Sequence, residues 1–150
     1  MRIRQALPAD VPAMQRVSVR AYDEYERRLG YTPHAASEDV AKWVRNGRAW
    51  VGEHASEVMA VLLVEPKDGH LHVFSAAVDP AWQGQGHGTE LLDHAAMLAK
   101  DAGLAEVRLT TNTKMDRNIA LYTHCGFQVV GQTPHPAQAS QALAELARRV

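Results

Sequence analysis

Residues 78–102 read V-D-P-A-W-Q-G-Q-G-H-G-T-E-L-L-D-H-A-A-M-L-A-K-D-A, and this stretch decides the fold. A run with strand character ends at Val78, because Pro80 removes a hydrogen-bond donor and restricts Asp79 before it. Three glycines follow, and then apolar residues at helical spacing predict a helix with one buried face, formed by Leu91, Leu92, Ala95, Leu98, Ala99 and Ala102. A glycine-rich turn that leads into a helix presents backbone N–H groups at the positive end of the helix dipole. We therefore predict an anion site, for which phosphate is the commonest ligand.

The spacing of the glycines limits which phosphate-binding loop this is. A dinucleotide-binding G-x-G-x-x-G would place its third glycine at position 89, which is Thr89, and a Walker loop needs a lysine, which the loop lacks. What remains is Gln83-Gly84-Gln85-Gly86-His87-Gly88, of the form Q-x-x-G-x-G. From these six residues alone, a glycine-rich turn without a ligand stays open as the alternative.

Length and composition restrict the class of protein. The 150 residues are expected to form one domain, 1–150, and a net charge of −1 without a basic block gives no support to nucleic-acid binding. The longest apolar run, Val58 to Val64, is too short to span a membrane, and the first residues lack an apolar signal segment, so we expect a cytoplasmic protein without a membrane partner. A single cysteine, Cys125, excludes an internal disulfide, and no histidine pair has metal-site spacing, so no metal is expected.

The order of the predicted elements indicates an α+β fold. Ser37 is expected to cap a second helix, and Asp10 the first. Strands are predicted at 2–7, 49–54, 58–65, 71–78, 106–112 and 127–133, and helices from 11, from 37 to 47, from after Gly88 to 102 and from 116 to 125. The glycine loop lies in mid-chain, whereas alternating nucleotide-binding folds usually carry it after the first strand.

Several segments in this order are similar to the GNAT superfamily of acetyl-CoA-dependent N-acetyltransferases. They are the Q-x-x-G-x-G loop, Asn118 followed by Tyr122, and Cys125-Gly126-Phe127, within an element order that matches from residue 2 to about residue 133. The resemblance implies a three-layer α/β/α fold, with a mixed, mostly antiparallel sheet and a splayed strand at the CoA site. It also implies acetyl-CoA as the co-substrate.

The resemblance also implies which residues bind the cofactor. The pantetheine arm would lie along Ala76, Ala77 and Val78, with a backbone N–H near Val78 as the donor to the thioester oxygen. The pyrophosphate would contact the loop, and Asn118 the pantetheine arm, which gives the set Gln83, Gly84, Gln85, Gly86, His87, Gly88, Thr89 and Asn118. His87 stands at a position that tolerates most residues, and an exposed helix position is the alternative for Asn118.

Two residues are candidates for catalysis. Tyr122, one helical turn after Asn118, is the natural general acid for the departing sulfur; a half-buried structural tyrosine is the alternative. Relatives often carry an acidic base where this chain has Phe74, so His72, on the same strand face, is the nearest titratable substitute. An exposed strand histidine is the alternative for His72.

The remaining predictions concern the acceptor site and the C-terminal residues. The resemblance implies that the aromatic and charged segment from Tyr22 to Tyr31 forms a wall of the acceptor site, where Tyr25, Arg28 and Tyr31 could bind a carboxylate or a ring; a solvated loop is the alternative. A primary amine, on a small molecule or a peptide N-terminus, is the expected acceptor. Proline residues after 133 and good helix formers from Ala139 to Arg149 predict a helix in place of the seventh strand, used in a possible homodimer. Phe74 and this tail support a rival interpretation, a degenerate acyl-CoA-binding sensor or regulatory domain, and a protein-interaction module is a second rival.

Overall fold

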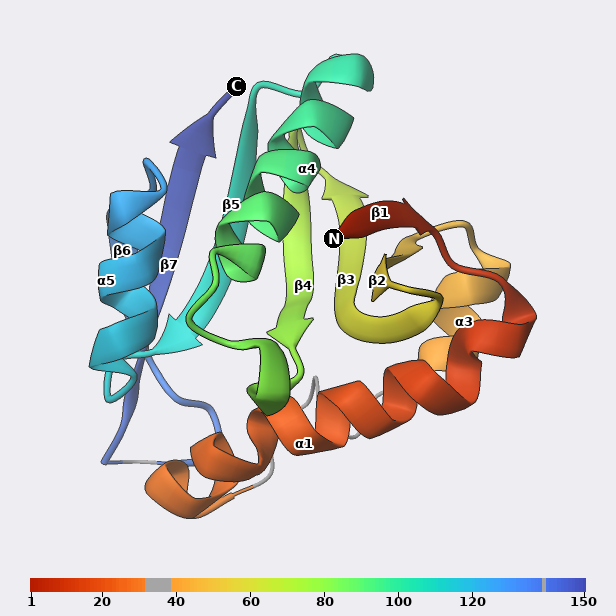
Figure 1. The fold of residues 1–150 in the computed structure, drawn as a ribbon. Coiled ribbons are helices and arrows are strands. Elements are labelled where there is room, and N and C mark those ends of the chain that lie inside the picture. Colours follow the sequence, from red (N-terminus) through yellow and green to blue (C-terminus); the bar gives the residue numbers. More distant parts are fainter. Residues whose placement is uncertain (32–38, 139) are drawn as a thin grey trace. The chain divides into compact units, whose positions relative to one another are not determined.

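The computed structural model describes residues 1–31, 39–138 and 140–150. Its elements, in chain order, are β1 (Arg2–Gln5), a 3-10 turn (Pro8–Asp10), α1 (Val11–Leu29), α3 (Val40–Arg45), β2 (Ala49–His54), β3 (Glu57–Lys67), β4 (His70–Val78), a 3-10 turn (Pro80–Trp82), α4 (His87–Asp101), β5 (Glu106–Asn112), α5 (Asp116–His124), β6 (Gln128–Pro134) and β7 (Ala142–Arg149) (Figure 1). The strands follow the order β1-β2-β3-β4-β5-β7-β6 in one sheet. Among the described helices, none is long and apolar enough to cross a membrane.

Strand pairing confirms the expected α+β class with a mixed, mostly antiparallel sheet. β4 and β5 run parallel, joined through His70, Leu71 and His72. The pairs β1–β2, β2–β3, β5–β7 and β6–β7 are antiparallel. The chain divides into two compact units, Met1–Val64 with Phe74–Leu91, and Glu65–Val73 with Leu92–Val150.

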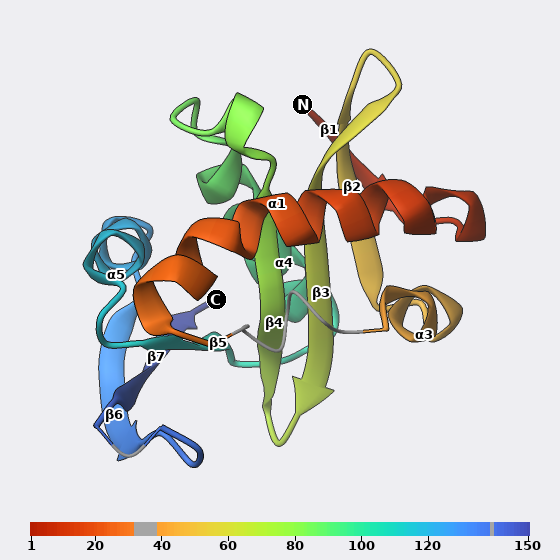
Figure 2. The same cartoon turned by 90° about the horizontal axis from the view of Figure 1, so that it is seen from below.

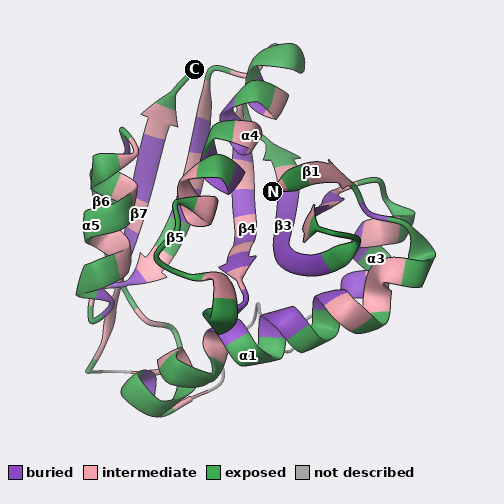
Figure 3. Cartoon of the chain, viewed as in Figure 1, coloured by how far each residue is buried: buried purple, intermediate pink, exposed green. Residues whose placement is uncertain are grey.

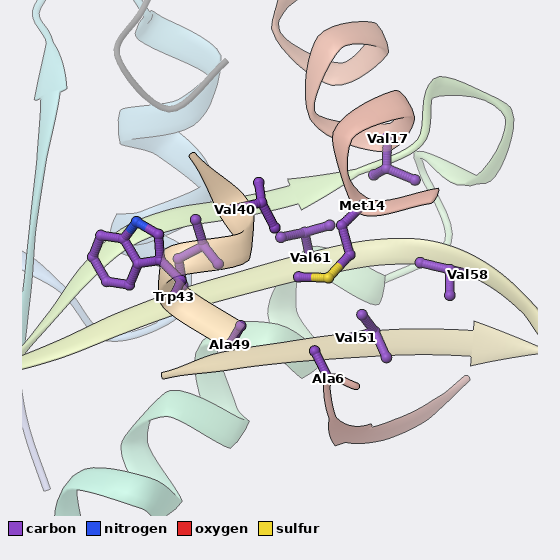
Figure 4. Close-up of a cluster of buried hydrophobic side chains, with 10 residues drawn as sticks. Ala6, Met14, Val17, Val40, Trp43, Ala49, Val51, Val58 and Val61 are labelled. Carbon is purple, nitrogen blue, oxygen red and sulfur yellow. The ribbon is translucent and has the colours of Figure 1, made fainter. Parts of the chain in front are cut away.

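The first unit is organised around a core between its strands and its two helices. Figure 2 shows α1 running across the strands of this unit, with α3 beside β2. Ten buried side chains form the core, nine of them labelled in Figure 4: Ala6, Met14, Val17, Val40, Trp43, Ala49, Val51, Val58, Val61 and Leu63. Burial of each larger side chain contributes about 1.5–3 kcal/mol. Phe74 packs against this core with its ring stacked on Trp43 at 5.0 Å between centroids.

The second unit has its own buried strands. β5 contributes Val107 and Leu109, and β7 contributes Ala144 and Leu146, all at most 3 % exposed. Figure 3 shows the buried part of β7 in purple. The edge strand β6 is exposed along its whole length.

The predicted C-terminal helix is wrong, because residues 142–149 form the strand β7. It lies between β5 and β6, with Leu146 opposite Leu109 on one side and Val129 on the other. Eight residues are too few for a stable isolated helix, so their helix propensity is outweighed by two ladders of backbone hydrogen bonds and by the burial of Leu146. Ala139, where the predicted helix began, lies outside the described residues.

Two predicted helix caps have different outcomes. Asp10 precedes α1, but its side chain does not cap that helix. Instead its carboxylate accepts two hydrogen bonds from Arg4, at 2.8 and 2.9 Å, and one from the Leu7 backbone N–H at 2.7 Å. The hydrogen bonds from Arg4 lower the pKa of Asp10, against the effect of its partial burial. The second cap, Ser37, lies outside the described residues.

Candidate active site

The C-terminal end of β4 presents one backbone edge away from β3. Immediately after the strand, the Asp79 N–H donates to the Met59 carbonyl of β3 at 2.8 Å. Backbone groups of successive strand residues point to opposite edges, so the N–H and C=O of Val78 and of Ala76 point away from β3, and those of Ala77 toward it. The candidate contact with pantetheine, Ala76 to Val78, therefore offers its polar groups along one edge.

The turn after β4 is held by side chains of the first unit. The Asp79 carboxylate accepts a hydrogen bond from the Ala81 N–H at 2.9 Å and lies 3.3 Å from the guanidinium of Arg20 on α1. The Gln83 amide donates to the Val78 carbonyl at 3.0 Å. Gln83 therefore ties the start of the glycine loop to the open edge of β4.

Two of the three loop glycines adopt a conformation that other residues avoid. Gly84 has φ +78° and Gly86 has φ +84°, both in the left-handed region. A Cβ at either position would meet no atom within 4 Å, so the surface above the loop is open. The Gly86 carbonyl accepts the first helical hydrogen bond of α4 from Glu90, at 3.1 Å. The N–H groups of the following turn, at His87, Gly88 and Thr89, therefore point out of the helix N-terminus, where an anion is stabilised.

Aromatic rings support the same loop from one side. The His87 imidazole lies 3.1 Å from the Glu90 carboxylate, and its ring centroid lies 6.3 Å from that of Trp82. Trp82 in turn contacts the ring of His54 at 5.1 Å. His87 thus has an intramolecular partner in the first turn of α4, while Gln85 stands exposed at the tip of the loop.

In the second unit, α5 carries the candidate general acid. Asn118 and Tyr122 lie one turn apart on this helix and are both half-buried. The Tyr122 ring packs edge-on against the buried Phe127, at 6.1 Å between centroids, and the Phe127 N–H donates to the Tyr122 carbonyl at 3.0 Å. Packing against Phe127 fixes the orientation of the Tyr122 ring.

The candidate base, His72, also belongs to the second unit. It is half-buried on β4, where it pairs with Arg108 of β5. Burial lowers the pKa of His72, the charges of Lys67 and His70 act in the same direction, and Glu65 and Glu145 act against it. The imidazole is therefore neutral at pH 7 and able to accept a proton.

The family of the chain follows from comparison with known proteins. The sequence profile of the acetyltransferase (GNAT) family matches residues 17–127, which include β4, the glycine loop and α5. The chain belongs to this family. The match confirms the expected family.

Two relatives and one solved structure illustrate the similarity. An uncharacterized protein of Mycobacterium leprae is 29 % identical over 147 residues, covering 95 % of this chain and 38 % of that protein. N-acetyltransferase 8F1 of Rattus norvegicus is 30 % identical over 102 residues, covering 63 % of this chain and 46 % of that protein. This GNAT chain therefore spans less than half the length of these two curated relatives. The PaiA N-acetyltransferase of Thermoplasma acidophilum, solved with coenzyme A, has the same fold, with a TM-score of 0.81 at 14 % identity over 99 % of this chain and 98 % of that one.

The residues at the end of β4 and in the glycine loop of this GNAT chain fit coenzyme A, with which the PaiA N-acetyltransferase was solved. The open surface above Gly84 and Gly86 leaves room for a pyrophosphate to approach the backbone, and the outward N–H groups at the start of α4 suit its charge. The edge of β4 at Val78 can accept an extended amide chain in the manner of an added strand. Among residues 1–31, 39–138 and 140–150, no group of three or more His, Cys, Asp or Glu is arranged to hold a metal ion.

The candidate residues fall into two sets. The structure places Ala76, Ala77, Val78 and the loop from Gln83 to Thr89 in the first unit. His72, Asn118 and Tyr122 belong to the second. The candidate wall residues Tyr25 and Arg28 lie near the end of α1, and Tyr31 follows that helix.

Sequence reasoning missed one contact of the first set. The Tyr22 hydroxyl lies 2.9 Å from the Ser75 hydroxyl of β4. From the sequence, Tyr22 is only the first residue of the segment expected to form the acceptor wall. Its spacing of eight residues from the buried Met14 and four from the buried Ser18 was the available sign that it faces inward.

Proposed function

We propose that this chain transfers the acetyl group of acetyl-CoA to a primary amine, on a small molecule or a peptide N-terminus, by direct attack. The observation that carries the proposal is the hydrogen bond from Gln83 to the Val78 carbonyl. It joins, within one unit, a strand edge suited to an amide chain and a helix N-terminus suited to phosphate. Acetyl-CoA supplies the activated acetyl group as a thioester.

The residues of the chain would divide the chemistry among them. The amine nitrogen attacks the thioester carbonyl carbon and the C–S bond breaks. The Val78 N–H would stabilise the charge on the carbonyl oxygen. Tyr122 would give its proton to the departing sulfur, and His72 would take the surplus proton of the amine, which as an alkylammonium has a pKa of about 10.4. The products are an amide and the free thiol of CoA.

The main rival is a domain that binds acyl-CoA without turnover. Phe74 favours it, because the ring stacked on Trp43 is part of the core and leaves no carboxylate at the usual position of the base. The tail no longer favours it, because residues 142–149 form β7. The homodimer and the cytoplasmic location stay predictions, and the helix expected to mediate the dimer is not formed.

Two measurements on the intact chain test the proposed function. Calorimetric titration with acetyl-CoA is expected to give micromolar affinity, and release of CoA thiol is expected with at least one member of a panel of amines, amino acids and peptides. Binding of acetyl-CoA without release of CoA thiol, whichever amine of the panel is added, would support the acyl-CoA-binding rival. No binding at millimolar acetyl-CoA would refute both the acetyltransferase and the acyl-CoA-binding domain. The protein-interaction module would then be the remaining interpretation.

The pH dependence of turnover tests His72. Because the pKa of His72 is lowered, the base is lost only as the pH falls below the ordinary value of about 6.5, so kcat should decline on that acidic side. His72→Gln should remove this decline and reduce kcat about tenfold. This is less than the ~10²–10⁴ usual for a general base, because water can also take the proton. An unchanged acidic limb in His72→Gln would assign the base elsewhere.

A further inference from the structure

The hydroxyl of Tyr22 connects α1 to the cofactor-binding end of β4. It lies 2.9 Å from the hydroxyl of Ser75, the residue before Ala76. Ser75 is only 2 % exposed. Burial raises the pKa of Tyr22, although the hydrogen bond with Ser75 acts in the opposite direction, so the hydroxyl stays neutral at physiological pH.

The position of this contact on β4 matters. The backbone groups of Ala76 point to the same edge as those of Val78, because the two residues are two apart in a strand. Tyr22 contacts the side chain of Ser75, directly before Ala76, and Gln83 donates to the carbonyl of Val78. One side chain from α1 and one from the glycine loop thus hold the end of β4 on either side of Ala76 and Ala77.

We propose that Tyr22 is a positioning residue for acetyl-CoA, which holds Ser75 and Ala76 so that the edge of β4 keeps the orientation in which it receives the pantetheine arm. The proposal rests on the proposed function, because it assigns this edge to the cofactor. Tyr22 acts through β4, so its loss weakens binding of the cofactor more than it affects the chemical step.

Removal of the Tyr22 hydroxyl is expected to cost free energy at the buried end of β4. A Tyr22→Phe substitution keeps the ring but leaves the buried Ser75 hydroxyl without this partner, and an unsatisfied buried polar group is costly. The segment can recover a hydrogen bond for Ser75 only by moving, and movement would reorient the neighbouring Val78 edge. When β4 is less constrained, we therefore expect a lower affinity for acetyl-CoA.

Calorimetric titration of the intact chain with acetyl-CoA tests the proposal. Tyr22→Phe is expected to weaken binding about tenfold at a temperature well below its melting point, with KM for acetyl-CoA raised and kcat nearly unchanged. Ser75→Ala, which removes the other partner of this hydrogen bond and leaves no buried hydroxyl on β4 unsatisfied, is expected to weaken binding about threefold. In the double variant the two effects should be less than additive, because they share one hydrogen bond.

Two control variants separate positioning from stability. Ser18 lies one turn before Tyr22 on α1, and its buried hydroxyl has no hydrogen-bond partner among the described residues, so Ser18→Ala should leave affinity unchanged. Asp10→Ala removes one of the two carboxylate partners of Arg4 and should lower the melting temperature without changing affinity. If the positioning role is right, affinity follows the Tyr22 contact and not the melting temperature.

The outcomes are distinct. Wild-type affinity in Tyr22→Phe, or in Ser75→Ala should Tyr22→Phe not fold, would overturn the positioning role while the proposed function stands. Equal losses of affinity in Asp10→Ala and Tyr22→Phe would also overturn it, because general destabilisation would then explain both. A failure of the proposed function is recognised separately, since the unmodified chain would then not bind acetyl-CoA.

Discussion

Gly86→Val is expected to lower the affinity for acetyl-CoA by about a thousandfold. At φ +84° a β-branched residue is strained, so the loop would rearrange at the point where α4 begins. The N–H groups of the first turn would then lose their common direction. A hydrogen bond to a charged group contributes about 1.5–3 kcal/mol, so the loss of two such bonds costs about 4 kcal/mol, which corresponds to about a thousandfold in affinity. Calorimetric titration with acetyl-CoA measures the change.

Gly103→Val is the matched control for this substitution. Gly103 follows the other end of α4 with φ +72°, and a Cβ there would also meet no atom within 4 Å. The strain and the loss of stability should therefore be similar, but the affinity for acetyl-CoA should stay as in the unmodified chain. Normal affinity in Gly86→Val would show that the loop does not bind the pyrophosphate.

The sequence predicts most of the fold because its local signals agree with one another. The spacing of apolar residues predicts the buried face of α4, and the structure buries Leu91, Leu92, Ala95 and Ala99. Leu98 is only half-buried, and Ala102, just after the last helical residue, is exposed. The change of period after Gly47 predicts the strands 49–54 and 58–65, which appear as β2 and β3 within two residues at each boundary. Local pattern and tertiary packing favour the same structure in these segments, so propensity is a reliable guide there.

The C-terminal strand shows where local pattern is insufficient. Residues 142–149 contain alanine, leucine, glutamate and arginine, all good helix formers, and their spacing fits a helical stripe as well as an alternating one. What selects the strand is the pairing of β7 with β6, whose Pro134 pairs with Ala142, and above all with the distant β5, whose Asn112 pairs with Leu143. A pairing between distant segments leaves no mark in the local sequence, so it could not be predicted from propensity.

Phe74 shows a similar limit at the site. Sequence reasoning noted that its position lacks a carboxylate, but could not say what the ring does. In the structure the ring stacks on Trp43 and packs against the core of the first unit. A carboxylate at this position would lose that packing and be desolvated beside an indole ring. In the proposed reaction the base would therefore be another group, and the neutral His72 is the candidate residue to test.

Tyr122→Phe is expected to reduce kcat about 100- to 1,000-fold and to leave the affinity for acetyl-CoA nearly unchanged. The ring would keep its packing against Phe127, so only the proton for the departing sulfur is removed. Stopped assays of CoA thiol release give kcat, and calorimetric titration gives the affinity. Thr123→Val is the control, since it removes the neighbouring hydroxyl of α5, which is exposed and bonded to the Ile119 carbonyl at 2.8 Å, and should not change turnover. Unaltered kcat in Tyr122→Phe would remove this residue from the mechanism. A parallel loss of kcat and affinity would instead assign the hydroxyl to cofactor binding.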